Sequence, residues 1–285
     1  MIRKITVIPA LVISGLIIVG VGVYLINQPP KPEIKKAVIL AGQDLPASPE
    51  ALGVGTTKET TDELKGGSSV FKDQIKASKD LGFVTSAPST IKTTNKGDNL
   101  LVLVNKSIRL PSSYFPKDLI SVDKSITASF GGMQLRKEAA ENLIKLFTDA
   151  KKKGYRLHLN SAYRSYQTQV ATYNYWVSQV GAAEADRFSA RPGHSQHQLG
   201  TTVDITSDTV DHKLISSFGD TLEGKWLASS GYKYGFVLAY PADYENITGY
   251  TYEPWHFRYI SIANAKKWKA SGMILELYLK KLGVW

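Results

Sequence analysis

Between residues 135 and 180 the spacing of apolar positions is helical, then alternating, then helical again. Apolar residues recur every three or four positions over 135–152, which predicts a helix, and Gly154 is placed to end it. Residues 155–161 alternate between apolar and polar, which predicts a strand. Residues 166–180 return to helical spacing and predict a second helix.

Two apolar patterns outside this region predict further strands. The run 100–104 is continuously apolar and predicts a buried strand that opens the folded part of the chain. Residues 201–206 alternate, with Val203 and Ile205 on one face and Asp204 on the other. We therefore expect Asp204 to point away from the apolar core.

A third alternating stretch lies near the C-terminus, at 255–259. It presents three aromatic residues on one face, and His256 and Arg258 on the opposite face. Pro254 disfavours helix at the preceding residue, so Glu253 is expected in extended backbone at the mouth of this strand. Helices followed by short strands predict an α+β fold, a small antiparallel sheet with helices packed on one face.

The N-terminal pattern differs from the rest of the chain. Residues 5–26 form a 22-residue, predominantly apolar run that spans about 33 Å as a helix, enough for the hydrocarbon core of a bilayer. A cleaved signal peptide is the alternative, but no Ala-x-Ala-like site closes the run. We predict a membrane anchor at 1–26. The flanking charges do not settle its orientation.

Residues 27–96 hold six of the chain's 12 prolines and only two aromatic residues. Such a segment buries too little apolar surface to offset its ordering entropy, so it is predicted to be a low-complexity tether. The remaining residues, 97–285, are then the functional domain, with a C-terminal helix.

Composition narrows the candidate chemistry. There is no cysteine, which excludes disulfides and thiolate metal sites. The formal net charge of +10 is spread along the chain without a recognisable nucleic-acid-binding module, so nucleic acid is not expected as a partner. An anionic cell envelope would suit a basic exported protein equally well. We expect a monomer.

The two C-terminal strand patterns bring metal-ligand side chains to polar faces. His197, Asp204 and His256 form a three-ligand set for zinc with one open position, and Glu253 remains as a candidate base. Taken singly, each histidine could be an ordinary hydrogen-bonded residue, and an aspartate at a strand end is often a turn former. Their joint occurrence favours a metal-dependent hydrolase.

The motif Ser195-x-His197-x-x-Gly200-x-x-x-Asp204, followed by Glu253-Pro254-Trp255-His256, resembles the zinc D-alanyl-D-alanine carboxypeptidases of the VanY and LdcB type, the M15B peptidases. The resemblance covers roughly residues 99–262. One mild departure is Thr202, where the family pattern has alanine. The resemblance implies a Hedgehog/DD-peptidase-like fold and zinc bound by the three residues named above.

The resemblance also implies roles for further residues. Arg164, in Tyr163-Arg164-Ser165, would hold the scissile carbonyl oxygen as negative charge develops on it. Ser195, Gln169 and Tyr240 would contact the substrate and its terminal carboxylate. Without the resemblance, Arg164 could be a local cap or ion pair, and Tyr240 an aromatic residue covering the sheet edge.

The other three histidines are weaker candidates. His194 is predicted to be a neighbour of the motif rather than a ligand, and His158 and His212 are predicted to be solvated. Two Ser-x-x-Lys matches lack the partner motifs of serine penicillin-binding enzymes, so a serine mechanism is not favoured.

These observations predict a membrane-anchored, single-pass enzyme whose domain lies outside the cytoplasm. It would remove the C-terminal D-alanine from peptidoglycan stem peptides, with Zn²⁺ as cofactor and Glu253 as general base. The alternatives are a D,D-dipeptidase or endopeptidase on the same scaffold, or a catalytically silent wall-binding module. The sequence does not separate D,D- from L,D-specificity.

Overall fold

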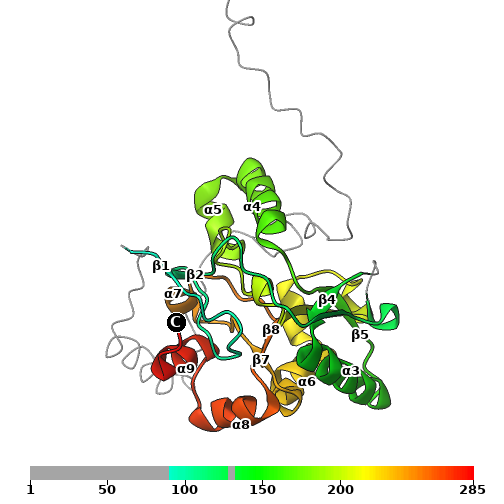
Figure 1. Cartoon of the computed structure of the whole chain (residues 1–285). Coiled ribbons are helices and arrows are strands. Elements are labelled where there is room, and N and C mark those ends of the chain that lie inside the picture. The colour runs from blue at the N-terminus through cyan, green and yellow to red at the C-terminus, as the bar shows by residue number, and fades with distance from the viewer. Residues whose placement is uncertain (1–89, 128–131) are drawn as a thin grey trace, which may run out of the picture. The chain divides into compact units, whose positions relative to one another are not determined.

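The two predicted motif strands pair with each other at the centre of a four-stranded antiparallel sheet (Figure 1). The computed structural model describes residues 90–127 and 132–285. The sheet order is β5 (Leu157–Ser161), β6 (Thr202–Ser207), β8 (His256–Tyr259) and β7 (Phe236–Leu238).

One face of this sheet carries the larger apolar core. Val203 and Ile205 of β6 and Phe257 of β8 are fully buried there, as their alternation predicts. They cluster with apolar residues of α3 (Lys137–Lys152) and with Leu227 of α6 (Leu222–Ser230). Burial of this kind stabilises a fold by about 25 cal/mol per Å² of apolar surface.

The opposite face is buried as well, so the prediction that helices pack on one face only is wrong. Val237 of β7 pairs directly with Arg258 and therefore lies on the polar face. It clusters with α8 (Ile262–Ser271) and α9 (Leu275–Leu282). The alternating polar residues point away from the larger apolar core, as predicted, but they face a second protein layer.

The run 100–104 is buried as predicted, but it is not a strand. Arg258, fully buried on the polar face, donates from Nη2 to the carbonyl oxygens of Leu100 and Val102, 3.0 Å away in each case. Two of the segment's carbonyl groups are thus satisfied by a guanidinium instead of a neighbouring strand, a long-range pairing that an apolar run does not reveal.

The two helices of the central region agree closely with the predictions. α3 begins two residues later than predicted, because Gln134–Arg136 forms β4, which pairs with β3 (Leu119–Ser121). Gly154 follows α3 with φ +86°, as a helix-ending glycine does. α4 (Tyr166–Val180) has the predicted bounds, and the Ser165 hydroxyl caps it by accepting from Thr168 N.

The remaining short elements frame the sheet. α5 (Ala182–Phe188) lies beside α4, and α7 (Glu245–Thr248) precedes β8 (Figure 1). β1 (Lys92–Thr93) pairs in parallel with β2 (Ile108–Arg109), so the end of the predicted tether takes part in the fold.

The predicted anchor at 1–26 and the tether up to residue 89 lie outside the described residues. Within 90–127 and 132–285, no helix combines the length and the apolar character needed to cross a bilayer.

Buried Glu276 yields a pH-dependent stability prediction. At the start of α9 it accepts a hydrogen bond from Asn105 Nδ2 at 2.5 Å, and burial raises its pKa from 4.5 to about 7. The folded protein therefore retains a proton that the unfolded chain releases between pH 4.5 and 7, so this group's stabilising contribution falls as pH rises through that window.

We expect Glu276→Gln, which keeps an acceptor for Asn105 but cannot ionise, to match the wild type near pH 4.5 and to exceed it in unfolding free energy above pH 7, by up to roughly 3 kcal/mol. Urea unfolding of both proteins at pH 5 and 8 measures the difference. A difference that does not change with pH would contradict the account.

Candidate active site

Asp204 stands between the two predicted histidine ligands. It lies directly opposite His256 in the β6–β8 ladder, and His197 comes from the short 3₁₀ turn Gln196–Leu199 that precedes β6. His197 Nε2 is 3.3 Å from Asp204 Oδ2, and His256 Nδ1 is 3.2 Å from Asp204 Oδ1. All three side chains are buried. The predicted convergence of the ligand set is present.

Gly200 ends the 3₁₀ turn before β6 and allows the chain to pack closely against Pro116 and Leu119. Its φ is +66°, and a Cβ there would lie 2.8 Å from Leu119 Cδ2 and 2.9 Å from Pro116 Cγ. Thr202, where the family pattern has alanine, donates from Oγ1 to Gln196 O at 3.1 Å and joins the turn to the strand.

The donor spacing suits a tetrahedral metal ion. Ligand atoms about 2.0–2.1 Å from such an ion lie about 3.3 Å from one another, close to the two imidazole–carboxylate distances in this group, and all three donors lie within 4.8 Å of one another. Asp204 Oδ1 is buried yet accepts no well-formed hydrogen bond within the described part of the chain. An orphaned buried carboxylate oxygen beside the His256 imidazole, with His197 at the other oxygen of the same carboxylate, fits a cation at this point. These residues therefore fit zinc.

Backbone and amide groups behind the imidazoles fix their orientation. His197 Nδ1 donates to Ala162 O at 2.6 Å, which leaves Nε2 free to ligate. His256 Nε2 lies 3.3 Å from Gln196 Oε1, which leaves Nδ1 toward Asp204. Sequence reasoning missed Gln196, although its position beside His197 placed it near the site.

Burial and neighbouring charges shift the pKa values of the site residues in opposite directions. Burial favours the neutral form of Asp204, but its two histidine neighbours hold its pKa well below the ordinary value. Burial lowers the pKa of His256 to about 4 despite the nearby Asp204 carboxylate, which favours the neutral imidazole that ligates metals.

Glu253 stands beside the ligand group without belonging to it. It precedes β8, as predicted, at the start of a turn in which His256 N donates to its carbonyl oxygen at 3.1 Å, and its Oε2 is 3.5 Å from His256 Nδ1. Burial, then repulsion from Asp204, raises its pKa well above 4.5, while Lys106 and Arg164 act in the opposite direction. A carboxyl group in such surroundings is suited to accept and return a proton.

Arg164 occupies the predicted junction between β5 and α4 and lines the same pocket as the three ligands and Glu253. Its guanidinium donates to Ser161 Oγ at 3.0 Å and to Gln169 Oε1 at 3.1 Å. Gln169 is buried, and its Nε2 donates to Ala190 O. Both ends of the Gln169 amide are therefore engaged within the protein. Its predicted substrate contact stays a prediction, and these bonds place Gln169 to hold the Arg164 guanidinium.

Ser195 and Tyr240 both line the pocket. The Ser195 hydroxyl accepts from His197 N at 3.3 Å and so caps the ligand turn. The Tyr240 ring lies 4.7 Å from the His256 ring, centroid to centroid, and burial raises its pKa well above 10, so it remains a neutral phenol. Each residue thus supports a ligand and also faces the pocket.

The comparisons with known proteins agree with this geometry. Residues 132–262 match the family model VanY: D-alanyl-D-alanine carboxypeptidase. The chain is 41% identical over 194 residues to the putative carboxypeptidase YodJ of Bacillus subtilis (strain 168), an alignment covering 67% of this chain and 71% of that protein. The chain belongs to the VanY D-alanyl-D-alanine carboxypeptidase family.

Two solved structures of VanY-like enzymes share its fold. The LdcB LD-carboxypeptidase superposes with a TM-score of 0.63 at 40% identity, covering 69% of this chain and 92% of that one. A mutant of the D,D-pentapeptidase VanY from a VanB-type resistance cassette, solved in complex with Zn(II), gives a TM-score of 0.54 at 31% identity, covering 63% and 98%. The prediction of a metallo-carboxypeptidase is confirmed at the level of the family.

The other histidines of this VanY-family chain divide into two cases. His194 is buried, its Nδ1 lies 2.7 Å from Asn105 O, and it stands outside the ligand group, so it is the neighbour that was predicted. His158 and His212 are not simply solvated. They are partly buried, and both contact Asp208. The contact of His158 spans 50 residues, which local sequence does not show, whereas His212 is four residues from Asp208.

Two glutamines of this VanY-family site are predicted to have separate effects, one on zinc affinity and the other on turnover. Gln196→Met removes the acceptor behind His256, so we expect zinc affinity to fall about 10- to 100-fold. Gln169→Met removes the acceptor behind Arg164, so we expect turnover to fall by a similar factor with zinc affinity unchanged. Competition with a zinc-binding dye and peptide hydrolysis measure the two effects separately. Equal loss of zinc affinity in both variants would contradict the separate roles.

Proposed function

We propose that the protein is a zinc-dependent carboxypeptidase that removes the C-terminal D-alanine from peptidoglycan stem peptides. The observation that carries the proposal is the convergence of the His197–Asp204–His256 group, Glu253 and Arg164 on one pocket. Membership of the VanY family supports the same reaction class.

The proposed chemistry divides between the metal and the protein. Bound zinc would supply a Lewis acid that lowers the pKa of water and polarises the scissile carbonyl. Glu253 would accept the proton of the attacking water and pass it to the leaving amine. Its buried position supports this role, because a carboxyl group with a raised pKa holds a proton more strongly than an exposed one.

Arg164 would stabilise the negative charge that develops on the carbonyl oxygen. Ser161 and Gln169 hold its guanidinium in a fixed orientation, so little reorganisation is needed during the reaction. Ser195 and Tyr240 would contact the terminal carboxylate of the substrate, since both line the pocket beside the ligand group.

Several specificities are compatible with this machinery. The two structural relatives are an LD-carboxypeptidase and a D,D-pentapeptidase, so the family alone does not choose between D,D and L,D cleavage. A D,D-dipeptidase or endopeptidase would use the same catalytic groups. The intact ligand set and Glu253 argue against a silent wall-binding module.

The apolar stretch 5–26 supports the further proposal that the enzyme is anchored in the cell membrane, with its domain outside the cytoplasm. Degradation of the domain by a protease added to intact protoplasts is the expected result. Protection of the domain until the membrane is permeabilised would contradict this orientation.

Substitutions at Glu253 and His256 separate catalysis from metal binding. Glu253→Gln keeps the size of the side chain but cannot take up a proton, so we expect turnover to fall on the order of 10²- to 10⁴-fold with zinc content retained. His256→Ala should lose zinc together with activity. Metal analysis alongside peptide hydrolysis measures both. Loss of zinc from Glu253→Gln would show that Glu253 is a metal ligand. Full activity of this variant would show that another residue is the general base.

Defined substrates test the reaction itself. We expect purified enzyme to release one D-alanine from a stem pentapeptide or tetrapeptide, to lose activity with a chelator, and to resist β-lactams, because the acylatable serine motif set is absent. Mass spectrometry shows which of the two stem peptides loses D-alanine and thereby identifies the specificity. Penicillin-sensitive hydrolysis that survives chelation would contradict the metal mechanism.

A further inference from the structure

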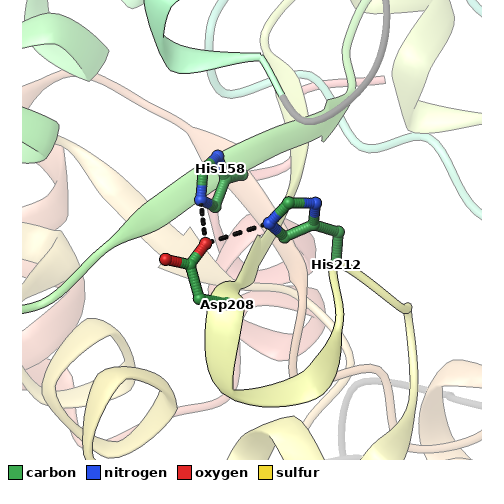
Figure 2. A group of neighbouring side chains, drawn as sticks. All are labelled: His158, Asp208 and His212. Atoms are coloured by element: carbon green, nitrogen blue, oxygen red, sulfur yellow. Dashed lines mark hydrogen bonds and ion pairs between the residues drawn. The ribbon is translucent and has the colours of Figure 1, made fainter.

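Four of the chain's five histidines fall into two groups that each contain two histidines and one aspartate. The second histidine group consists of His158, Asp208 and His212 and uses none of the catalytic residues (Figure 2). His158 extends from β5, whereas Asp208 and His212 belong to the segment that follows β6.

The three side chains of the second histidine group converge on one point. His158 Nε2 lies 2.5 Å and His212 Nε2 2.9 Å from the same atom, Asp208 Oδ1 (Figure 2). The two imidazole rings are 4.2 Å apart, centroid to centroid. His212 and the preceding Asp211 both have left-handed backbone, with φ of 59° and 50°, which turns the chain back toward Asp208. Such backbone is uncommon outside glycine.

Two imidazoles and one carboxylate are the donors that zinc and neighbouring transition metals prefer, whereas calcium and magnesium favour sites made of oxygen atoms. We propose that His158, Asp208 and His212 form a second binding site for a divalent transition metal ion of the zinc class, with water completing the coordination.

Binding requires only a small opening of the group. Donor atoms around a tetrahedral ion lie about 3.3 Å apart, so each imidazole would move away from Asp208 Oδ1 by less than about 1 Å. The side chains of His158, His212 and Asp208 are 23%, 38% and 45% exposed, which leaves room for that movement and for a water ligand. Arg156 Nη1, 3.6 Å from Asp208 Oδ2, would hold the non-ligating oxygen and orient the carboxylate.

An ion at the second histidine group would link two segments that form one wall of the catalytic pocket. Asn160, two residues beyond His158 on β5, donates from Nδ2 to His212 O at 2.9 Å. Asn160 and Leu214 both line the pocket that holds the catalytic ligands. A metal joining β5 to the 208–212 segment would therefore limit movement of that wall. The inference concerns metal binding and does not depend on the proposed hydrolytic function.

The rival account is a hydrogen-bonded cluster without metal, in which both Nε2 atoms donate to the carboxylate. The two accounts differ in metal stoichiometry. The full-length protein is stripped with a chelator and then titrated with Zn²⁺ by calorimetry. We expect two equivalents to bind the wild type, the second more weakly, because the second histidine group is half exposed and the catalytic group is buried.

Asp208→Asn and Asp211→Asn form a matched pair for this test. Asp211 lies three residues away in the same segment, its side chain is 84% exposed, and asparagine tolerates its left-handed backbone. We expect Asp208→Asn to bind one equivalent and Asp211→Asn to bind two. His212→Asn, which also suits the local backbone, should bind one. It provides a second variant should Asp208→Asn fold poorly.

Imidazole ¹⁵N spectra locate the second ion. Zn²⁺ added beyond the first equivalent should shift the Nε2 resonances of His158 and His212 and leave those of His194 unchanged. Binding of only one equivalent by the wild type would overturn the proposal. A second equivalent that survives both Asp208→Asn and His212→Asn would also overturn it.

Discussion

The structure depends on burying one carboxylate, that of Asp204, in the middle of a sheet. An isolated charge in such a place is strongly unfavourable, and only opposite or coordinating partners offset the lost hydration. The antiparallel ladder supplies one partner directly, because Asp204 and His256 are paired residues of adjacent strands. The 3₁₀ turn that precedes β6 supplies the other, His197. The position of the ligand group is therefore a consequence of strand register.

The layers packed on the two faces of the sheet hold the ligand group in position. The apolar face of the sheet packs on α3 and α6, which fixes the strands that carry the ligands. On the polar face, Arg258 ties the buried 100–104 segment to β8, and Gln196 and the Ala162 carbonyl hold the imidazoles. The same principle extends to Arg164, whose guanidinium is held by Ser161 and Gln169. The groups that we propose for metal binding and catalysis are thus held by the packed sheet, and buried polar groups orient them.

Local sequence patterns predicted those features that depend on near neighbours. The bounds of α4, the glycine that follows α3 and the opposite faces of Val203 and Asp204 follow from periodicity and from the conformational preferences of single residues. The ligand group was predictable because alternation places Asp204 and His256 on polar faces and the combined motif is specific. Glu253 followed from its position before Pro254.

Features that depend on distant contacts were not predictable in this way. The 100–104 run has the composition of a strand, but its carbonyl groups pair with Arg258, more than 150 residues away. Helices were expected on one face of the sheet only, but the polar face is also buried because α8 and α9 pack there with Val237. Gln169 was assigned to the substrate by resemblance alone, and its hydrogen bond to the Ala190 carbonyl, 21 residues away, is not visible in the local pattern.

The most direct test of the account is a crystal structure of the zinc-loaded protein with anomalous data collected on both sides of the zinc absorption edge. The account predicts an ion about 2.0–2.2 Å from His197 Nε2, His256 Nδ1 and an oxygen of Asp204, with Glu253 outside the coordination sphere. An ion bound by Glu253, or no ion between these two histidines, would contradict it.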